Sequence, residues 1–362
     1  MRSSRPWAGR ALAVAVALVA VSLWLTASRA EARRRTRPKH AIKFATIAPE
    51  GSTWLNIMRE LDKELYERTG GKLGFRIYAG GVSGDEKDVL RKIRIGQLHA
   101  AGFTGVGMGE ILPEIRILDL PFLFFNYDEV DHVLSRMRET FEAKFLERGF
   151  VLLGWAEVGF VHFFSKEPIR TQADLKARKL WVWQDDPLAL AYFKALGVSP
   201  TPLAVTDVLT SLQTDLIDTV YTSPLGMIAL QWHTKVSFMS ALPMADAAGA
   251  VLVDRRVFER LSPEHQKLLK ELTPKYMRRL VLRTREDNAR SVEVLRSRGL
   301  TIVPPPPPEQ LESFLATGRE AQDSLAGELF SRELLDEVRR AVEEYRRAHP
   351  GSSLAPVTAT SR

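Results

Sequence analysis

The sequence predicts an α/β protein of two lobes, with the chain crossing between the lobes several times. Residues 41–78 follow the order strand, helix, strand, which is the repeat unit of a parallel sheet. Residues 174–224 form a second unit of short strands and helices. A helix expected from Thr273 to Arg298 would be roughly 37 Å long at about 1.5 Å per residue, enough to reach from one lobe to the other.

Residues 1–32 have the pattern of a secretory signal peptide. Three arginines in the first ten residues precede the apolar run Ala11–Leu25, and small residues stand at Ala30 and Ala32, as before a cleavage site. This order predicts export through the Sec pathway, cleavage and a periplasmic protein, with an uncleaved membrane anchor as the alternative. The chain has no cysteine, which excludes a lipid-anchored cysteine and disulfide bonds.

The basic character of the chain is confined to its beginning. The whole sequence carries a formal charge of +7, but residues 1–40 hold nine Lys or Arg against one Glu, so residues 41–362 carry −1. A near-neutral folded part gives no electrostatic argument for binding nucleic acid.

The first predicted unit consists of strand Ala41–Ile47, a helix to Arg68 with Ser52 as its N-cap, and strand Lys72–Tyr78. A strand at Ala100–Thr104 is expected to end where a ligand would lie. Further along, a helix is predicted at 126–146, a strand at 150–157 and a separate extended run at 159–165.

The unit at 174–224 contains the residues most informative about function. Trp181 and Trp183 alternate along the end of the strand at 179–183, so they face the same side of the sheet. Another strand leads to Tyr221, and Thr222 and Ser223 follow it. Open α/β sheets bind ligands at such strand ends, although buried aromatic residues more often belong to a core. We expect a pocket here with aromatic or neutral walls.

No pattern typical of a catalytic or metal site is present in the sequence. The seven histidines lack metal-ligand spacing, and no serine stands in a G-x-S-x-G motif. The glycine-rich segment Gly80–Glu86 lacks the Lys of a phosphate-binding loop and ends in two acidic residues. Asp185 and Asp186 are better explained by an N-cap before Pro187 than by a cation site. We therefore expect neither an enzyme nor a bound metal or cofactor.

The expected lobes are discontinuous in sequence. We assign 41–158 with 248–283 to the first lobe, 159–247 with 284–348 to the second, and 349–362 to a disordered tail. The last two helices are expected at 309–330 and 332–348, after a proline-rich spacer at 304–308.

An ordered set of motifs resembles the DctP-type periplasmic substrate-binding subunit of TRAP transporters, over about residues 42–345. The motifs are IKFATIAPEGSTW (42–54), YAGGVSGDEKDVL (78–90), DLPFLF (119–124), GWAEVGFVHF (154–163), DLKARKLWV (174–182), FKALGVSPTPL (193–203) and LTSLQTDLID (209–218). The resemblance implies the two-domain periplasmic binding protein fold, with a cleft between α/β domains and a long domain-crossing helix. It also implies a small-molecule ligand and membrane permease subunits as partners.

The chain departs from the family pattern at the residues that usually hold a carboxylate. Trp181 stands where most members have an Arg, and Val161 stands where a second Arg is frequent. Thr222 and Val205 replace a common Asn and a common aromatic residue. Loss of both arginines predicts a hydrophobic or amphipathic ligand, because a buried carboxylate without a donor is costly.

Two alternatives remain open: organic-acid uptake (a 2-oxo acid or a dicarboxylate) with a relocated cation or a metal held by Asp or Glu, and a periplasmic scaffold that binds no solute. A subgroup of the family with an apolar cleft pairs with a periplasmic tetratricopeptide-repeat protein, which leaves such a partner open here. The expected ligand-binding residues are seven apolar or aromatic and four polar ones: Phe103, Phe160, Val161, Trp181, Trp183, Val205 and Tyr221, with Glu50, Glu157, Thr222 and Ser223.

Overall fold

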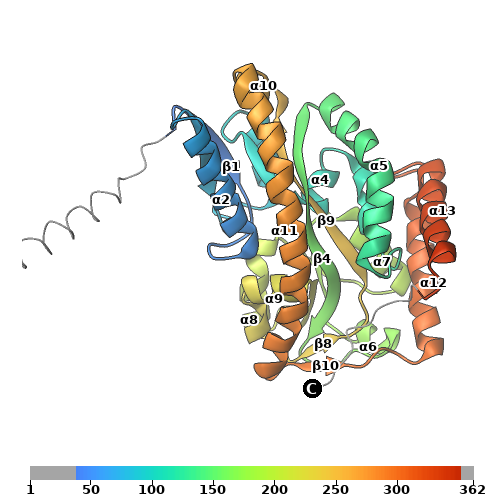
Figure 1. Cartoon of the computed structure of the whole chain (residues 1–362). Coiled ribbons are helices and arrows are strands. Elements are labelled where there is room, and N and C mark those ends of the chain that lie inside the picture. Colours follow the sequence, from blue (N-terminus) through green and yellow to red (C-terminus); the bar gives the residue numbers. More distant parts are fainter. Residues whose placement is uncertain (1–37, 352–362) are drawn as a thin grey trace, which may run out of the picture.

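A computed structural model describes residues 38–351, in which helices cover a central mixed sheet (Figure 1). The predicted signal peptide, and all but the first residues of the predicted tail, lie outside this range. Within it, no helix is both long enough and apolar enough to cross a membrane.

The first lobe is built on three strands and the helices between them. Its elements are β1 (His40–Ala45), α2 (Thr53–Arg68), β2 (Leu73–Tyr78), α3 (Glu86–Arg94), β3 (Ala100–Thr104), α4 (Gly105–Gly109), the 3-10 helix η1 (Pro113–Asp119) and α5 (Tyr127–Glu147). β1 pairs in parallel with β2 on one side and β3 on the other. The hydroxyl of Ser52 caps α2 by accepting a hydrogen bond from the Leu55 amide, as the sequence predicted.

The second lobe contains shorter elements. They are α6 (Gln172–Lys176), β5 (Trp181–Trp183), α7 (Pro187–Leu196), β6 (Thr201–Leu203), η2 (Val205–Asp207), α8 (Val208–Gln213), β7 (Thr219–Thr222), α9 (Pro224–Ala229), η3 (Trp232–Thr234) and β8 (Phe238–Ser240). Asp186 caps α7 through a hydrogen bond from the Leu188 amide, which confirms the predicted N-cap before Pro187.

Two long strands join the lobes. β4 (Phe150–Ser165) and β9 (Ala245–Asp254) pair antiparallel over most of their lengths. In the sheet order β10-β8-β4-β9-β3-β1-β2, they stand between the strands of the two lobes, and β7 pairs with β4. The separate strands predicted at 150–157 and 159–165 are wrong, because β4 continues through a register shift between Glu157 and Gly159.

Helix α11 (Pro263–Ser297) is longer than predicted and runs along both lobes (Figure 1). Its 35 residues extend about 52 Å. The expected start at Thr273-Pro274 is wrong, since Pro274 lies inside the helix. Pro274 has no NH group to bond the carbonyl of Lys270, four residues before it. Both residues are on the exposed face of the helix, where water can hydrate that carbonyl. Buried side chains on the opposite face continue through this point.

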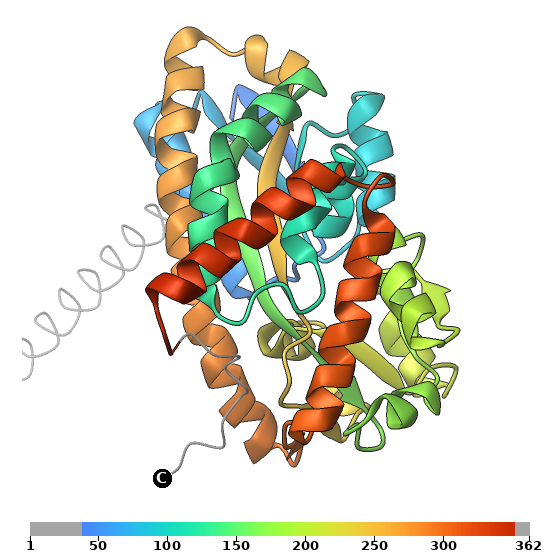
Figure 2. The same cartoon turned by 90° about the vertical axis from the view of Figure 1, so that its right-hand side faces the viewer.

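After β10 (Thr301–Val303), the last two helices lie on different lobes. α12 (Pro308–Leu325) packs against α7, whereas α13 (Arg332–Ala348) packs against α5. Figure 2 shows this last helix, in red, lying across α5. Its residues Leu335 and Val338 share a core with Phe141 and Phe145. The expected assignment of 284–348 to the second lobe therefore does not describe the packing of α13.

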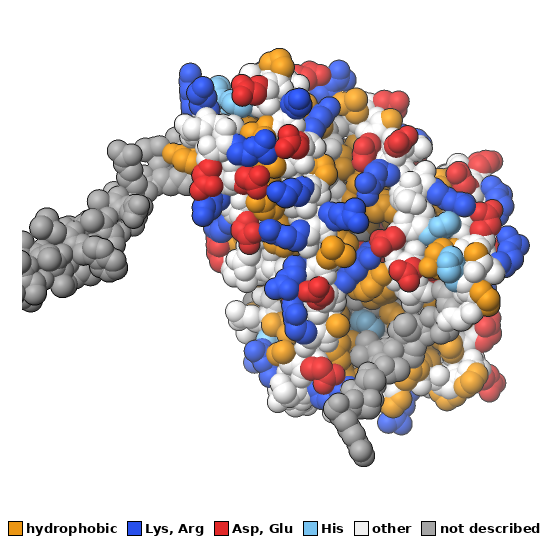
Figure 3. All heavy atoms as spheres, viewed as in Figure 1, with side chains coloured by type: hydrophobic (Ala, Val, Ile, Leu, Met, Phe, Trp, Pro, Cys, Tyr) orange, Lys and Arg blue, Asp and Glu red, His pale blue; other side chains and the backbone are white. Residues whose placement is uncertain are grey.

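The face of the molecule seen in Figure 3 carries no large field of one charge. On the face seen in Figure 3, Lys and Arg side chains alternate with Asp and Glu. This mixture agrees with the near-neutral charge of residues 41–362.

Helix α11 packs closely on β4 at Gly154. A Cβ atom added there would lie 2.7 Å from Cγ of Met277. We expect Gly154→Ala to lower the free energy of unfolding by about 1–3 kcal/mol, because the core has no room for the added atom. Urea unfolding measures the effect. In a Met277→Ala background the same change should cost much less; an equal cost in both backgrounds would contradict this packing.

Candidate functional site

A cavity of about 210 Å³ lies between the lobes. One water molecule needs roughly 10–15 Å³ by a comparable measure, so the cavity has space for a solute of many atoms. The first lobe supplies the ends of β1 and β3 with the segments after them, and the second supplies residues around β5, β7 and α9. The crossing strands contribute Val161 and residues 245–247, and α11 contributes Thr284.

Aromatic rings form one wall of the cavity. The ring of Trp181 stacks on Tyr221 at 4.8 Å between centroids, and meets Trp232 edge-on at 5.4 Å. Trp183 lies on the same side, 6.1 Å from Trp181, as the alternation along β5 predicted. Val182 points the other way into the core of the second lobe. The wall therefore combines rigid apolar surfaces whose positions are fixed by β5.

The polar groups of this wall are bonded within the protein. The indole NH of Trp181 donates to the carbonyl of Leu203 at 3.0 Å, and that of Trp183 donates to the carboxylate of Asp85 at 2.8 Å. The hydroxyl of Tyr221 accepts a hydrogen bond from the Trp183 amide. With these donors used, the rings present mainly their apolar faces to the cavity.

Asp85 also links the two lobes. It belongs to the segment before α3 in the first lobe, and it accepts hydrogen bonds from the Trp183 indole and the Val205 amide of the second. Nearby, Lys87 pairs with Asp185 across the same boundary. These direct contacts hold the lobes together around the cavity.

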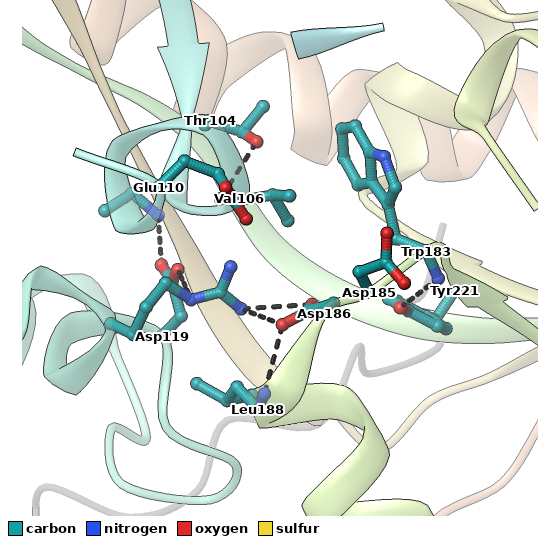
Figure 4. Close-up of polar contacts among 12 residues, drawn as sticks. Thr104, Val106, Glu110, Asp119, Trp183, Asp185, Asp186, Leu188 and Tyr221 are labelled. Atoms are coloured by element: carbon teal, nitrogen blue, oxygen red, sulfur yellow. Dashed lines mark hydrogen bonds and ion pairs between the residues drawn. The ribbon is translucent and has the colours of Figure 1, made fainter. Parts of the chain in front are cut away.

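A buried ion triad forms another part of the cavity wall. The guanidinium of Arg116 pairs with Asp119 at 3.2 Å and with Asp186 at 3.1 Å. Figure 4 shows Asp119 and Asp186 pointing toward one another from the two sides of the triad. Asp119 also accepts from the Ala248 amide, and Asp186 from the Leu188 amide. Because Asp186 comes from the second lobe, the triad is another connection between the lobes.

Arg116 is the only Arg, Lys or His among the described residues that line the cavity. The acidic residues there are Glu86, Asp119, Asp186 and Asp246. Burial raises the pKa of Asp119 to about 6, against the opposing effect of Arg116. The cavity therefore offers more negative than positive charge to a solute.

Glu86 and Asp246 lie in contrasting surroundings. Glu86 accepts hydrogen bonds from the Thr104 amide and hydroxyl and from the Gly107 amide. Asp246 is 1% exposed, and neither carboxylate oxygen has a hydrogen-bond partner in the described part of the chain. Two other polar atoms of the lining, the hydroxyls of Tyr192 and Thr284, likewise have none there.

Eight of the eleven residues proposed from the sequence line the cavity. They are Phe103, Val161, Trp181, Trp183, Val205, Tyr221, Thr222 and Ser223.

The remaining three lie outside the cavity lining, which corrects the expectation for them. Glu50 is exposed and pairs with Arg59. Glu157 is buried but bound by Arg285 of α11 at 2.6 Å. Phe160 packs on Tyr127, with the ring centroids 4.8 Å apart. Each side chain is engaged by a partner that its local sequence did not indicate.

Sequence reasoning missed the four ionisable groups Glu86, Arg116, Asp119 and Asp246. The one available signal was an arginine and an aspartate within the apolar run 115–120, where charged residues are unusual. Among the residues that the structure describes, no group of three or more His, Cys, Asp or Glu is arranged to hold a metal ion.

Comparison with known proteins places this architecture among solute-binding proteins. A family model described as bacterial extracellular solute-binding protein, family 7 (DctP) matches residues 44–328. The 2,3-diketo-L-gulonate-binding periplasmic protein YiaO of Escherichia coli is 26% identical over 248 residues, covering 66% of this chain and 73% of the relative.

Two solved structures show the same fold. A TRAP periplasmic solute-binding protein from Xanthobacter autotrophicus with bound β-D-galacturonate is 22% identical, with a TM-score of 0.77, covering 83% of this chain and 99% of that one. The sugar acid binding protein DctPAm of Advenella mimigardefordensis, in complex with galactonate, is 19% identical, with a TM-score of 0.79, covering 85% and 99%. These likenesses confirm the predicted fold class.

Titration of Glu86 should be visible in the stability of the protein. Burial is the main cause that raises the pKa of Glu86 to about 7. A carboxyl group with a higher pKa in the folded than in the unfolded state contributes stability that is lost as pH rises through the folded pKa. We expect the stability advantage of wild type over Glu86→Gln to fall by on the order of 1–3 kcal/mol between about pH 5 and about pH 8.

Urea unfolding of both proteins at each pH measures this difference. Parallel pH profiles for wild type and variant would show that Glu86 does not titrate in this way.

Proposed function

The chain belongs to family 7 of the bacterial extracellular solute-binding proteins, and we propose that it captures an amphipathic, largely apolar solute for a TRAP transporter. Members of this DctP family are periplasmic solute receptors rather than enzymes. TRAP solute-binding proteins bind small molecules and work with membrane permease subunits.

The observation that carries the proposal is the chemistry of the cavity walls. Trp181, Trp183 and Tyr221 supply an apolar surface whose NH and OH groups are bonded within the protein. Burying an apolar solute against such a surface is favourable by roughly 25 cal/mol per Å². The hydroxyls of Tyr192 and Thr284, which lack partners among the described residues, would bond a polar end of the same solute.

The position of the cavity supports capture by domain closure. Both lobes line it, and Asp85, Arg116 and Asp186 join the lobes directly. On this proposal the contacts part when a solute enters or leaves, as in hinge closure around a ligand. The receptor would thus release its solute when the lobes separate at the permease.

An organic acid is the second candidate, because the similar structures hold galacturonate and galactonate and because Arg116 lies in the wall. Arg116 would be the relocated cation of that alternative. Its guanidinium, however, already pairs with Asp119 and Asp186. A solute carboxylate would therefore meet a guanidinium whose charge two carboxylates already balance, and would add a third buried negative charge beside them. We therefore favour the amphipathic solute.

The proposed contact residues are the eight sequence-predicted residues that line the cavity, together with Tyr192 and Thr284. The proposed partners are the membrane permease subunits. A tetratricopeptide-repeat partner stays a prediction.

Introducing a charge into the aromatic wall tests this function. We expect Trp181→Arg to weaken binding of the uncharged fluorescent probe N-phenyl-1-naphthylamine by roughly tenfold or more, because the arginine charge would be buried beside the probe. Fluorescence titration of the purified protein measures the affinity. Trp155→Phe, a change in the core of the first lobe away from the cavity lining, serves as the control.

Galacturonate and galactonate are titrated against wild type by isothermal titration calorimetry, which detects their binding without the probe. Tight binding of either acid by wild type, with no uptake of the probe, would reject the amphipathic solute in favour of the organic acid.

A further inference from the structure

We propose that Asp246 anchors the polar end of the solute and selects a cationic nitrogen there. The solute class would then be an apolar or aromatic molecule that carries an amine or guanidinium group. This inference rests on the proposed function and specifies its solute. It comes from a difference in hydrogen bonding among the buried carboxyl groups of the cavity.

Three of the four acidic side chains in the lining have their partners. Glu86 receives hydrogen bonds from Thr104 and Gly107. Asp119 and Asp186 share Arg116 and each also accepts from a backbone amide. These three groups therefore need no hydrogen bond or ion pair from a solute.

Asp246 is the exception. It lies on β9 opposite Phe160 of β4, it is 1% exposed, and it lines the cavity. Both of its carboxylate oxygens lack a hydrogen-bond partner in residues 38–351. A buried carboxyl group without a hydrogen-bond partner is costly, so a solute group that bonds to Asp246 would complete the site.

The neighbouring charges do not supply that group. Arg285 attracts Asp246 electrostatically, but its guanidinium is bound by Glu157 and Asp131. Glu157, Asp119 and Asp131 all act against the ionised form of Asp246. Together with burial, which is the largest cause, they raise the pKa of Asp246 well above its ordinary value.

A cation satisfies this site better than a neutral donor. A hydroxyl group could form one hydrogen bond, but it would not offset the negative charge of Asp119 and Asp186 in excess of Arg116. An ammonium group favours the ionised form of Asp246, pairs with it and offsets that charge. The aromatic rings of the cavity also attract cations through their faces. A carboxylate solute would add negative charge to that of Asp119 and Asp186.

The test uses three solutes with the same eight-carbon chain: octylammonium, 1-octanol and octanoate. Each is titrated against wild-type protein by isothermal titration calorimetry, and N-phenyl-1-naphthylamine is titrated separately by fluorescence. We expect octylammonium to bind roughly tenfold or more tightly than octanoate, with 1-octanol between them. In Asp246→Asn, which keeps the shape and removes the charge, the affinity for octylammonium should fall toward that for 1-octanol.

Asp207→Asn is the matched control, because Asp207 is exposed, lies outside the cavity lining and makes no capping hydrogen bond to α8. It should keep the wild-type preference. Octanoate binding as well as octylammonium in wild type, or an unchanged preference in Asp246→Asn, would overturn the role of Asp246 while leaving the apolar cavity intact. Failure of the probe and all three solutes to bind would overturn the proposed function as well.

Discussion

The buried triad of Asp119, Arg116 and Asp186 is the constraint on which the cavity depends. Arg116 and Asp119 belong to the first lobe, and Asp186 caps the first helix after β5 in the second. A buried guanidinium with only one carboxylate would leave much of its desolvation cost unpaid, but here two carboxylates surround it and backbone amides bond both of them. The triad therefore fixes the lobes together and uses up the only positive charge among the described residues of the lining.

The pairing of Arg116 within the protein explains the chemical character of the rest of the cavity. In a cavity whose cation is already paired, a solute carboxylate finds no unpaired positive charge, whereas the rings of Trp181, Trp183 and Tyr221 offer a continuous apolar surface. The fold is shared with structures that hold sugar acids. The difference in solute is therefore proposed to lie in a few side chains and not in the architecture, as expected when function is set by a site grafted on a common fold.

Local rules predicted the elements well where local physics decides. The N-caps at Ser52 and Asp186 and the shared face of Trp181 and Trp183 depend on residues only a few positions apart. The rules failed at two local break signals. Helix α11 continues past Pro274 because of packing along its length, and β4 continues past the register shift after Glu157 because of its pairing with β9. Such tertiary effects are absent from any short window of sequence.

The same distinction explains the site. Periodicity brought the aromatic residues to one side of β5, and most of them line the cavity. Arg116 and Asp186 are in contact although they are 70 positions apart in the sequence. Arg285, which pairs with Glu157, is 128 positions away from it. No spacing rule connects residues so far apart, so the charge balance of the cavity could be recognised only in three dimensions.

Native mass spectrometry of the protein, purified from a bacterial periplasm without detergent, tests most directly whether the cavity receives an amphipathic solute. The expected result is a protein-bound mass that organic solvent extracts and that fragments as an apolar skeleton with a polar end. A bound sugar acid or other small polyhydroxy acid, with no apolar component, would contradict the proposed function.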